Sequence, residues 1–291
     1  MTNKNIVILG GTDGIGRALA QMLVRDNFVL IIGRSENKGR RFTEQNERNA
    51  KYLVADLSLL NNLSSVVHDI KSEFETIDYI IHTADVLKVK RHNTTEGLET
   101  CIATNYYSRV LFNQLIIGEE PSLRPERIIH IGLAGIKPSR NFIQNFPLPD
   151  SANSFKGHAI GQIANDFYAL YINRKLKDLG IKINVLNPGT VDTNIRRSGQ
   201  FPPIVKRLII PLIEFLLRGK TQKPQDYADI PLAILKNGNS DSNEFVLIDS
   251  KGKGITGNNQ VHDTNIQQEL YEVTKKQIDK VLQSSKVDKW L

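Results

Sequence analysis

Cysteine is nearly missing from this chain, and long hydrophobic runs are missing altogether. Cys101 is the only cysteine, so the chain cannot build an internal disulfide framework, and this usage suits a reducing compartment. No apolar stretch reaches the roughly 18–20 residues that a membrane-spanning helix needs. Residues 1–5 are polar and lead directly into an apolar run, so we expect no signal peptide. We predict a cytoplasmic protein, and we predict no metal site.

Acidic residues are scarce in one segment of the chain. The formal net charge is +7, and residues 196–223 contain seven basic side chains against a single acid, Glu214. The remainder of the chain is therefore close to neutral. We expect no nucleic-acid partner, because proteins that bind nucleic acids usually spread or repeat their basic contacts.

Strand-like and helical segments alternate along the whole chain. The strand-like runs are 5–10, 28–33, 51–55, 77–82, 127–132, 182–187 and 244–249. The helical patterns are 15–25, 36–46, 59–73, 95–117, 154–179, 224–236 and 264–282. This alternation predicts an α/β fold, a single Rossmann-type doubly wound parallel sheet of about seven strands with helices on both faces. We predict one domain over residues 1–291.

A glycine-rich turn follows the first strand-like run. Gly10, Gly14 and Gly16 have the spacing G-x3-G-x-G, and an amphipathic helix follows them. Glycines allow the backbone to approach a ligand closely, and the start of a helix offers free N–H groups and the positive end of a dipole. The combination of strand, glycine turn and helix predicts a site for the pyrophosphate of a nucleotide.

Further motifs occur in a familiar order. Asp56-Leu57 follows the third strand, Ala103-Thr104-Asn105 lies in the fourth helix, and Asn187-Pro188-Gly189 follows the sixth strand. With the glycine turn, these motifs make the chain resemble a short-chain dehydrogenase/reductase over essentially its whole length. Within that family it is most similar to the retinol-dehydrogenase-like branch, through the segments GRSENKGRRF and TTEGLETCIATNYYSRVLFNQLI and the long insert before the sixth helix.

The resemblance implies a nicotinamide cofactor. In the family, the acid at Asp56 holds the adenine amino group, and the Pro-Gly-x-x-x-Thr stretch that ends at Thr193 lies beside the nicotinamide carboxamide. Residues 82–85 read His-Thr-Ala-Asp where the family has Asn-Asn-Ala-Gly, which is a poor match. The predicted cofactor-binding residues are Gly10, Thr12, Asp13, Gly14, Ile15, Gly16, Arg17, Arg34, Ser35, Asp56, Leu57, Thr83, Ala84, Pro188, Gly189 and Thr193.

The choice between NAD and NADP depends on the end of the second strand. An NAD enzyme usually presents an acid there, to bind the 2′-hydroxyl of the ribose. In this chain Gly33 is followed by Arg34 and Ser35. Arg34 can pair with a 2′-phosphate, and Arg17 in the first helix could assist. We therefore predict NADP(H).

The catalytic positions depart from the family pattern. The family uses Asn to support a proton relay, Ser to bind the carbonyl oxygen, Tyr as acid/base, and Lys to lower the Tyr pKa and hold the ribose. Asn105 is retained, but the Ser position is Gly132 or Leu133, and the Tyr and Lys positions are His158 and Gln162. The candidate catalytic residues are therefore Asn105, His158 and Gln162.

A second Tyr-x3-Lys pair lies in the same helix. Tyr171 lies only 17 positions before Pro188, whereas His158 lies 30 positions before it, as the family register requires. At a rise of about 1.5 Å per residue, Tyr171 would lie nearly 20 Å from the site. We interpret Tyr171 as a packing residue.

The His-x3-Gln pair offers its own chemistry. His158 and Gln162 share a helix face. A neutral Gln162 can still bind a nicotinamide ribose hydroxyl, although it cannot tune the pKa of a neighbour. Free histidine titrates near a pH of about 6.5 and tyrosine near about 10, so a protonated His158 could supply the proton as hydride reaches a carbonyl carbon.

Three functions remain open from the sequence. The first is an NADP(H)-dependent oxidoreductase that acts on an apolar carbonyl or alcohol, with His158 in place of Tyr. The second is a non-redox enzyme on the same scaffold, such as a lyase, isomerase or cyclase. The third is a nucleotide-binding pseudoenzyme that acts as a sensor or assembly partner. All three keep the glycine turn and Arg34.

The apolar and basic segment around residues 204–217 suggests how partners bind. By resemblance, residues 190–223 form a lid over a pocket for a small apolar substrate. A second interpretation is that the basic rim at 196–223 recruits an anionic carrier of the substrate, an acidic partner or an anionic membrane surface. The amphipathic helix at 264–282 could dock on the body of the protein or on another subunit of a homo-oligomer.

Overall fold

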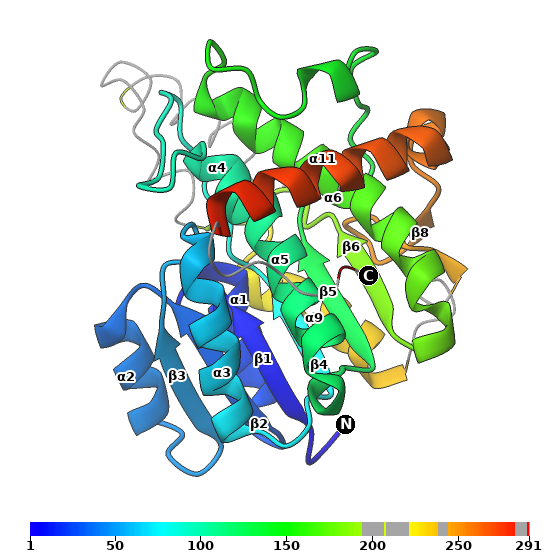
Figure 1. The fold of residues 1–291 in the computed structure, drawn as a ribbon. Coiled ribbons are helices and arrows are strands. Elements are labelled where there is room, and N and C mark those ends of the chain that lie inside the picture. The colour runs from blue at the N-terminus through cyan, green and yellow to red at the C-terminus, as the bar shows by residue number, and fades with distance from the viewer. Residues whose placement is uncertain (194–206, 208–220, 238–243, 283–289, 291) are drawn as a thin grey trace.

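The computed structural model describes residues 1–193, 207, 221–237, 244–282 and 290 (Figure 1). Most of the predicted lid at 190–223 therefore lies outside the described residues. So does most of the basic rim at 196–223, and the predictions made for these segments stay predictions.

One sheet forms the centre of the molecule (Figure 1). Its strands are β1 (Asn5–Leu9), β2 (Phe28–Gly33), β3 (Ala50–Val54), β4 (Tyr79–His82), β5 (Arg127–Ile131), β6 (Lys182–Leu186), β7 (Leu247–Ile248) and β8 (Gly254–Ile255). The order is β3-β2-β1-β4-β5-β6-β7-β8, and all neighbours are parallel except β7 and β8. The predicted fold class is confirmed. The short antiparallel β8 was not predicted, because two residues carry no readable pattern.

The helices follow the predicted segments closely, with one exception. They are α1 (Gly14–Leu23), α2 (Glu36–Glu44), α3 (Leu63–Glu73), α4 (Thr100–Ile102), α5 (Ser108–Gln114), α6 (Ser154–Leu176), α9 (Pro224–Asn237) and α11 (Thr264–Leu282). The helix predicted at 95–117 begins only at Thr100 and is interrupted by π-helical segments at Ala103–Tyr107 and Leu115–Glu119. π-Helical turns inside longer helices are frequent at functional sites, and Asn105 lies in the first one.

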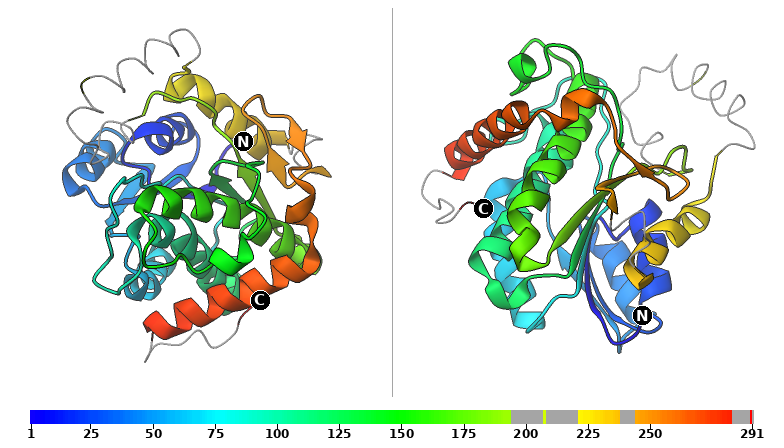
Figure 2. Two further views of the ribbon diagram at one scale, coloured as in Figure 1. Left: turned by 90° about the horizontal axis from the view of Figure 1, so that it is seen from above. Right: turned by 90° about the vertical axis from the view of Figure 1, so that its right-hand side faces the viewer.

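Each face of the sheet has its own hydrophobic core. Along β1, Ile6 and Ile8 pack with α1, Phe42 of α2, and α9, whereas Val7 and Leu9 pack with α3, α5 and α6. Successive side chains of a strand point to opposite faces, so a strand buried on both faces is apolar throughout. Figure 2 shows the two helical layers on either side of the sheet.

The C-terminal helix α11 docks on the body of the same chain (Figure 1). Tyr271 of α11 packs against Tyr171 of α6 with ring centroids 4.9 Å apart, and the Thr274 hydroxyl lies 2.9 Å from that of Tyr106. Tyr171 thus lies under α11, and it does not line the cavity described below. No helix in the described ranges combines the length and apolarity needed to cross a bilayer.

The strand order creates a switch point beside β1. The chain runs from β1 outward to β2 and β3, and then returns to β4 on the other side of β1. The loops after β1 and β4 therefore leave the sheet in opposite directions. In this architecture the crevice between them, at the carboxyl ends of the strands, is where ligands bind.

Candidate active site

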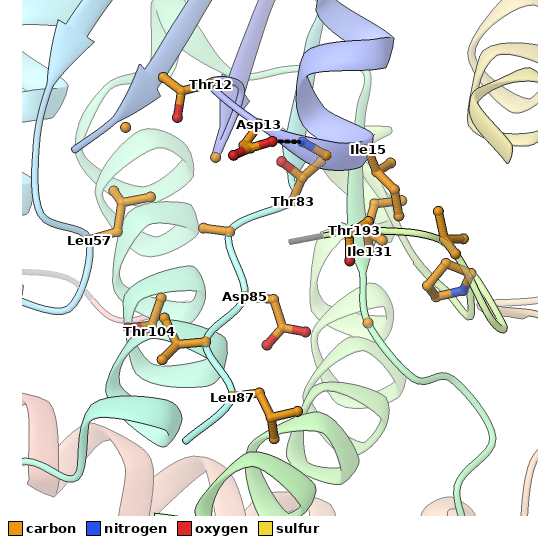
Figure 3. Close-up of a pocket in the computed structure, with 18 of the residues that line it drawn as sticks. Thr12, Asp13, Ile15, Leu57, Thr83, Asp85, Leu87, Thr104, Ile131 and Thr193 are labelled. Atoms are coloured by element: carbon orange, nitrogen blue, oxygen red, sulfur yellow. Dashed lines mark hydrogen bonds between the residues drawn. The ribbon is translucent and has the colours of Figure 1, made fainter. Parts of the chain in front are cut away.

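A cavity of about 510 Å³ lies at the carboxyl edge of the sheet (Figure 3). Its lining comes from segments at the carboxyl ends of β1 to β6, so it includes the switch point. The predicted cofactor residues that line it are Gly10, Thr12, Asp13, Gly14, Ile15, Arg34, Asp56, Leu57, Thr83, Ala84, Pro188, Gly189 and Thr193. Its volume is in the range typical of small-molecule sites.

The glycine turn forms one wall of this cavity. Gly10 has φ +92°, and a Cβ there would lie 2.4 Å from the backbone nitrogen of Ala84, so only glycine fits. Asp13 caps α1 by accepting a 2.8 Å hydrogen bond from the N–H of Gly14. The start of α1 therefore faces the cavity with a tight backbone turn. This is the form of cradle in which the oxygens of a pyrophosphate bind.

Two predicted cofactor residues near this turn do not line the cavity. A Cβ on Gly16 would lie 2.3 Å from Thr83 Oγ1, so Gly16 allows α1 to pack closely against the loop after β4. Arg17 lies over the ring of Phe42, with its guanidinium carbon 4.4 Å from the centroid, and donates to Gln45 at 3.2 Å. Gly16 thus has a packing role, and the Arg17 side chain lies on Phe42 outside the cavity lining. Their contacts with a cofactor stay predictions.

A free cation lies at the end of β2. Arg34 is exposed, lines the cavity, and makes no ion pair within the described part of the chain. The nearby carboxylate of Asp13 is paired with Lys38 of α2. The acid at the cradle is therefore neutralised, while Arg34 keeps its donors for an anionic ligand. Ser35 does not line the cavity. It caps α2, where its hydroxyl accepts from the N–H of Lys38.

The adenine and nicotinamide ends of the predicted cofactor site lie in the same cavity. One Asp56 carboxylate oxygen accepts from the backbone N–H and hydroxyl of Ser58, at 2.9 and 2.8 Å, which fixes the side chain. At the opposite end Gly189 has φ +63°, and its N–H donates to Asn187 Oδ1 at 2.9 Å. The loops after β3 and β6 are thus held in place by side-chain contacts of their own.

His158 is the candidate catalytic residue that lines the cavity. It projects from α6, and its side chain is only 12% exposed. Its Nδ1 lies 2.9 Å from Asn105 Nδ2, 3.1 Å from the Val86 carbonyl and 3.3 Å from Asp85 Oδ1. The structure records no protein partner for Nε2 among the described residues. The ring is therefore anchored through Nδ1, and Nε2 is its available nitrogen.

Asn105 supports this arrangement from beneath the cavity. Its Oδ1 accepts from the N–H of Val86 at 2.8 Å, and its Nδ2 donates to the Val86 carbonyl at 2.9 Å. This two-point contact fixes the orientation of the amide. The backbone carbonyl of Asn105 accepts from Asn165 Nδ2 at 2.9 Å, across the π-helical turn. Asn105 is fully buried and does not line the cavity.

The surroundings of His158 act on its proton affinity in opposite directions. Burial on its own lowers the pKa of His158, because it disfavours the charged imidazolium. The adjacent Asp85 carboxylate and the Val86 carbonyl outweigh burial, so that the pKa lies above its ordinary value of 6.5. The charge of Arg109 acts against them. The net effect of these surroundings favours the protonated form of His158.

Gln162 takes a different place from the one its helical spacing predicts. Its side chain is fully buried, and its Oε1 lies 2.8 Å from where a Cβ of Gly132 would stand. It does not line the cavity, so the expected contact with a ribose hydroxyl is not made by this conformation. The physical reason is that Gly132 has no side chain. The Gln162 amide lies next to the space that a side chain at position 132 would occupy.

Two functional residues were not identified from the sequence. Asp85 ends the turn after β4, at a position where the family pattern has glycine, and this exchange was a signal that could have been followed. Arg109 lies on α5, fully buried, and its Nη2 donates to the carbonyls of Ala84 and Ile131 at 3.0 and 2.9 Å. Burial lowers its pKa to about 10, so the guanidinium remains charged at neutral pH.

A line of buried polar groups continues from Asn105 into the core. Asn165 Oδ1 lies 3.3 Å from His130, and Asn113 joins His130 to His82 through contacts of 3.1 and 2.9 Å. Burial lowers the pKa of His82 to about 3 and lowers the pKa of His130 well below its ordinary value. Both rings are therefore neutral. They serve as fixed hydrogen-bonding groups that hold α5 and α6 against β4 and β5.

Comparison with known proteins agrees with this geometry. Residues 4–137 match the family of short chain dehydrogenases. Human retinol dehydrogenase 14 is 24% identical over 227 residues, which cover 72% of this chain and 68% of that protein. An uncharacterized oxidoreductase of Saccharomyces cerevisiae is 26% identical over 271 residues, or 86% of this chain and 80% of the other. These distant relatives support the resemblance read from the sequence motifs.

Solved structures share the fold at still lower identity. A short chain dehydrogenase from Burkholderia cenocepacia, in complex with NADP, aligns with a TM-score of 0.64 and 18% identity, covering 87% of this chain and 98% of that one. At this identity the likeness concerns the fold alone.

Proposed function

We propose that this member of the short-chain dehydrogenase/reductase superfamily is an NADP(H)-dependent oxidoreductase that acts on an apolar carbonyl or alcohol, with His158 as its acid/base. The observation that carries the proposal is the setting of His158. It lines the cavity that begins at the glycine turn, it is held through Nδ1, and its pKa is raised. These are the properties required of a group that gives a proton at neutral pH.

The residues present fit the cofactor. The turn at Gly10, which only a residue without a Cβ can adopt, and the start of α1 would hold the pyrophosphate. Asp56 would hold the adenine, and Pro188 and Gly189 would border the nicotinamide. When bound, NADPH supplies hydride to the carbonyl carbon. The NADP in the Burkholderia relative supports the choice of cofactor class, and Arg34 beside a neutralised Asp13 favours the 2′-phosphate.

The proton has a defined route. In the reductive direction, the imidazolium of His158 gives the proton on Nε2 to the carbonyl oxygen, which becomes the alcohol hydroxyl. The neutral ring is then recharged from solvent at the same atom. Asn105 holds the loop at Val86, and so the position of the ring, while it stays outside the cavity itself.

Part of the cavity lining favours an apolar substrate. Val86, Leu87, Leu133 and Val191 line the same cavity as His158. They offer aliphatic surface and no side-chain hydrogen bond to a polar substrate. The oxygen that reacts would then be the one group that needs a polar partner.

The test is turnover by the purified full chain. Incubation with NADPH and a panel of apolar ketones and aldehydes, with the alcohol product identified, should show stoichiometric oxidation of NADPH. A Gly10→Ala variant serves as the control, because its methyl group collides with the backbone at Ala84 and should abolish cofactor binding. If the wild type binds NADPH and reduces no member of the panel, the oxidoreductase proposal is wrong.

One observation favours a second candidate function. Position 132 is a glycine and has no hydroxyl, and position 162 is a glutamine and has no positive charge. The Gln162 side chain is buried, with its Oε1 close to Gly132. A protein that binds the nucleotide without hydride transfer, as a sensor, an assembly partner or a non-redox enzyme, needs neither group. NADPH binding by calorimetry in the absence of any turnover would support this alternative.

A further inference from the structure

Nδ1 of His158 lies close to one hydrogen-bond donor and to two hydrogen-bond acceptors. The amide of Asn105 is fixed by its contacts with Val86, so it is the NH₂ group that faces Nδ1, at 2.9 Å. The Val86 carbonyl at 3.1 Å and Asp85 Oδ1 at 3.3 Å can only accept. A bare Nδ1 satisfies Asn105, whereas a protonated Nδ1 satisfies Asp85 and Val86. One nitrogen cannot do both.

The hydrogen bonding of the Asp85 carboxylate decides whether a bare or a protonated Nδ1 of His158 is favoured. Its Oδ1 is buried and makes no hydrogen bond of good geometry, and Nδ1 of His158 lies 3.3 Å from it. A buried carboxylate oxygen without a donor is costly. The amide of Asn105, in contrast, already donates to the Val86 carbonyl and loses little if Nδ1 carries a hydrogen.

We propose that Asp85 is a positioning residue that keeps a hydrogen on Nδ1 of His158 and so makes Nε2 the nitrogen that exchanges its proton with the pocket. This inference deepens the proposed function and rests on it. Without Asp85, donation from Asn105 favours a bare Nδ1 and a permanent hydrogen on Nε2. The ring would then titrate at Nδ1, on the side away from the substrate.

Charge acts together with this geometry. Among the described residues, the ionisable groups that act on His158 are Asp85, from the loop after β4, and Arg109, from α5. The Asp85 carboxylate raises the pKa of His158, and the Arg109 cation lowers it. Burial lowers the pKa of Arg109, and the negative charge of Asp85 acts against this by raising it. The three residues form an electrostatically coupled group, with one anion and two cations when His158 is protonated.

The experiment is nitrogen-15 NMR of the histidine rings in the full chain, with the His158 signals identified by their loss in His158→Phe. In the wild type, neutral His158 should carry its hydrogen on Nδ1. Asp85→Ala removes both charge and acceptor, so the neutral ring should change to the Nε2–H tautomer. Its pKa should fall by about one pH unit, a tenfold loss of proton affinity.

Two further variants separate charge from hydrogen bonding. Asp85→Asn keeps an acceptor and removes the charge, so we expect a lower pKa for His158 with less change of tautomer. Asp150→Ala removes a fully exposed carboxylate that pairs with Arg91, and it should leave the His158 signals unchanged. A neutral wild-type ring with its hydrogen on Nε2 overturns the inference even if no Asp85 variant folds. An unchanged pKa and tautomer in folded Asp85→Ala overturns it as well.

The activity readout keeps this inference distinct from the proposed function. If the enzyme reduces carbonyls, Asp85→Ala should lower kcat with little change in KM, and the decline of kcat with rising pH should move about one unit lower. Turnover with an unchanged pH profile in that variant would contradict the role of Asp85 and leave the reductase proposal standing. If Asp85→Ala changes the tautomer and pKa of His158 in a protein that shows no turnover, the pairing of Asp85 with His158 is supported and the reductase proposal is contradicted.

Discussion

The two ends of the cavity have diverged from the family pattern to different degrees. At the end proposed to hold the cofactor, here called the nucleotide end, the glycine turn, Asp56 and the Pro188-Gly189 pair all line the cavity. At the end proposed to carry the chemistry, here called the catalytic end, three of the four family positions carry another residue, and two charged side chains outside the pattern, Asp85 and Arg109, lie close by. The nucleotide end is defined by backbone shape. The catalytic end depends on side chains whose charges are coupled, so one exchange alters what its neighbours need.

The largest expected effect comes from removing the acid itself. His158→Phe should reduce turnover by about 10²–10⁴-fold, the usual contribution of a general acid, because His158 is the one imidazole among the described residues that line the cavity. NADPH affinity, measured by calorimetry, should stay nearly unchanged, since the cradle lies at the other end. Wild-type reduction should decline as pH rises through the raised pKa of His158. Turnover that survives the substitution without pH dependence would contradict the assignment.

The helix that carries His158, α6, also holds a buried carboxyl group that makes stability depend on pH. Asp166 is buried on α6, its Oδ1 is unpartnered, and burial raises its pKa to about 8. Between about pH 4 and 8 the unfolded chain releases this proton while the folded chain keeps it, so the free energy of unfolding falls as pH rises. This contribution is absent below the unfolded pKa.

Asp166→Asn should remove that decline. At pH 7 the variant should be more stable than the wild type by about 2–4 kcal/mol, with a smaller difference at pH 4. Urea denaturation at several pH values measures the slope directly. Because an asparagine at this position also has an unpartnered group, the comparison of slopes is the test, and parallel pH dependences in the two proteins would show that Asp166 ionises normally.

A substitution at the nucleotide end should leave the chemistry intact and alter cofactor choice. Arg34→Ala should weaken NADP(H) binding by about 1.5–3 kcal/mol, as expected for loss of a charge-assisted hydrogen bond, and should leave NAD(H) binding unchanged. Calorimetric titration of both cofactors measures this. Equal wild-type affinities for the two cofactors would contradict the predicted preference.

The smallest expected effect is at Arg17, which is the matched control for Arg34. Because its guanidinium packs on Phe42 and does not line the cavity, Arg17→Ala should leave the ratio of NADP(H) to NAD(H) affinity within about twofold of the wild type, a difference of roughly 0.4 kcal/mol. A loss of preference as large as that of Arg34→Ala would mean that Arg17 reaches the 2′-phosphate after all.

Restoring the family residues tests how far the catalytic end has diverged. Gly132→Ser, His158→Tyr and Gln162→Lys together recreate the family pattern. However, Arg109 Nη1 lies 3.7 Å from the Cβ position at 132, next to the Gln162 amide. A lysine introduced at 162 would meet this buried cation. We therefore expect the triple variant to be unstable or inactive by turnover assay unless Arg109 is replaced as well, and full activity without that change would refute this reasoning.

Local sequence determined the fold and the nucleotide end. Apolar runs specify buried parallel strands, and the spacing of Gly10 and Gly14 after such a run predicts a tight turn with positive φ, although the close approach of Ala84 to Gly10 is seen only in the tertiary structure. The register of α6 placed His158 in the site in the same way. Arg34 lines the cavity because it directly follows the end of a strand, and its contact with a 2′-phosphate stays a prediction.

Tertiary structure decided the rest. Whether the Arg17 side chain lined the cavity depended on Phe42, and whether Gln162 lined it depended on the missing side chain of Gly132. The proposed tautomer of His158 depends on Asp85 and Asn105 from two other elements. These residues are far apart in sequence and meet only through the sheet order. Hydrogen bonds and ion pairs act over a few ångströms in space, so a linear pattern carries no record of which distant side chain will satisfy or charge another.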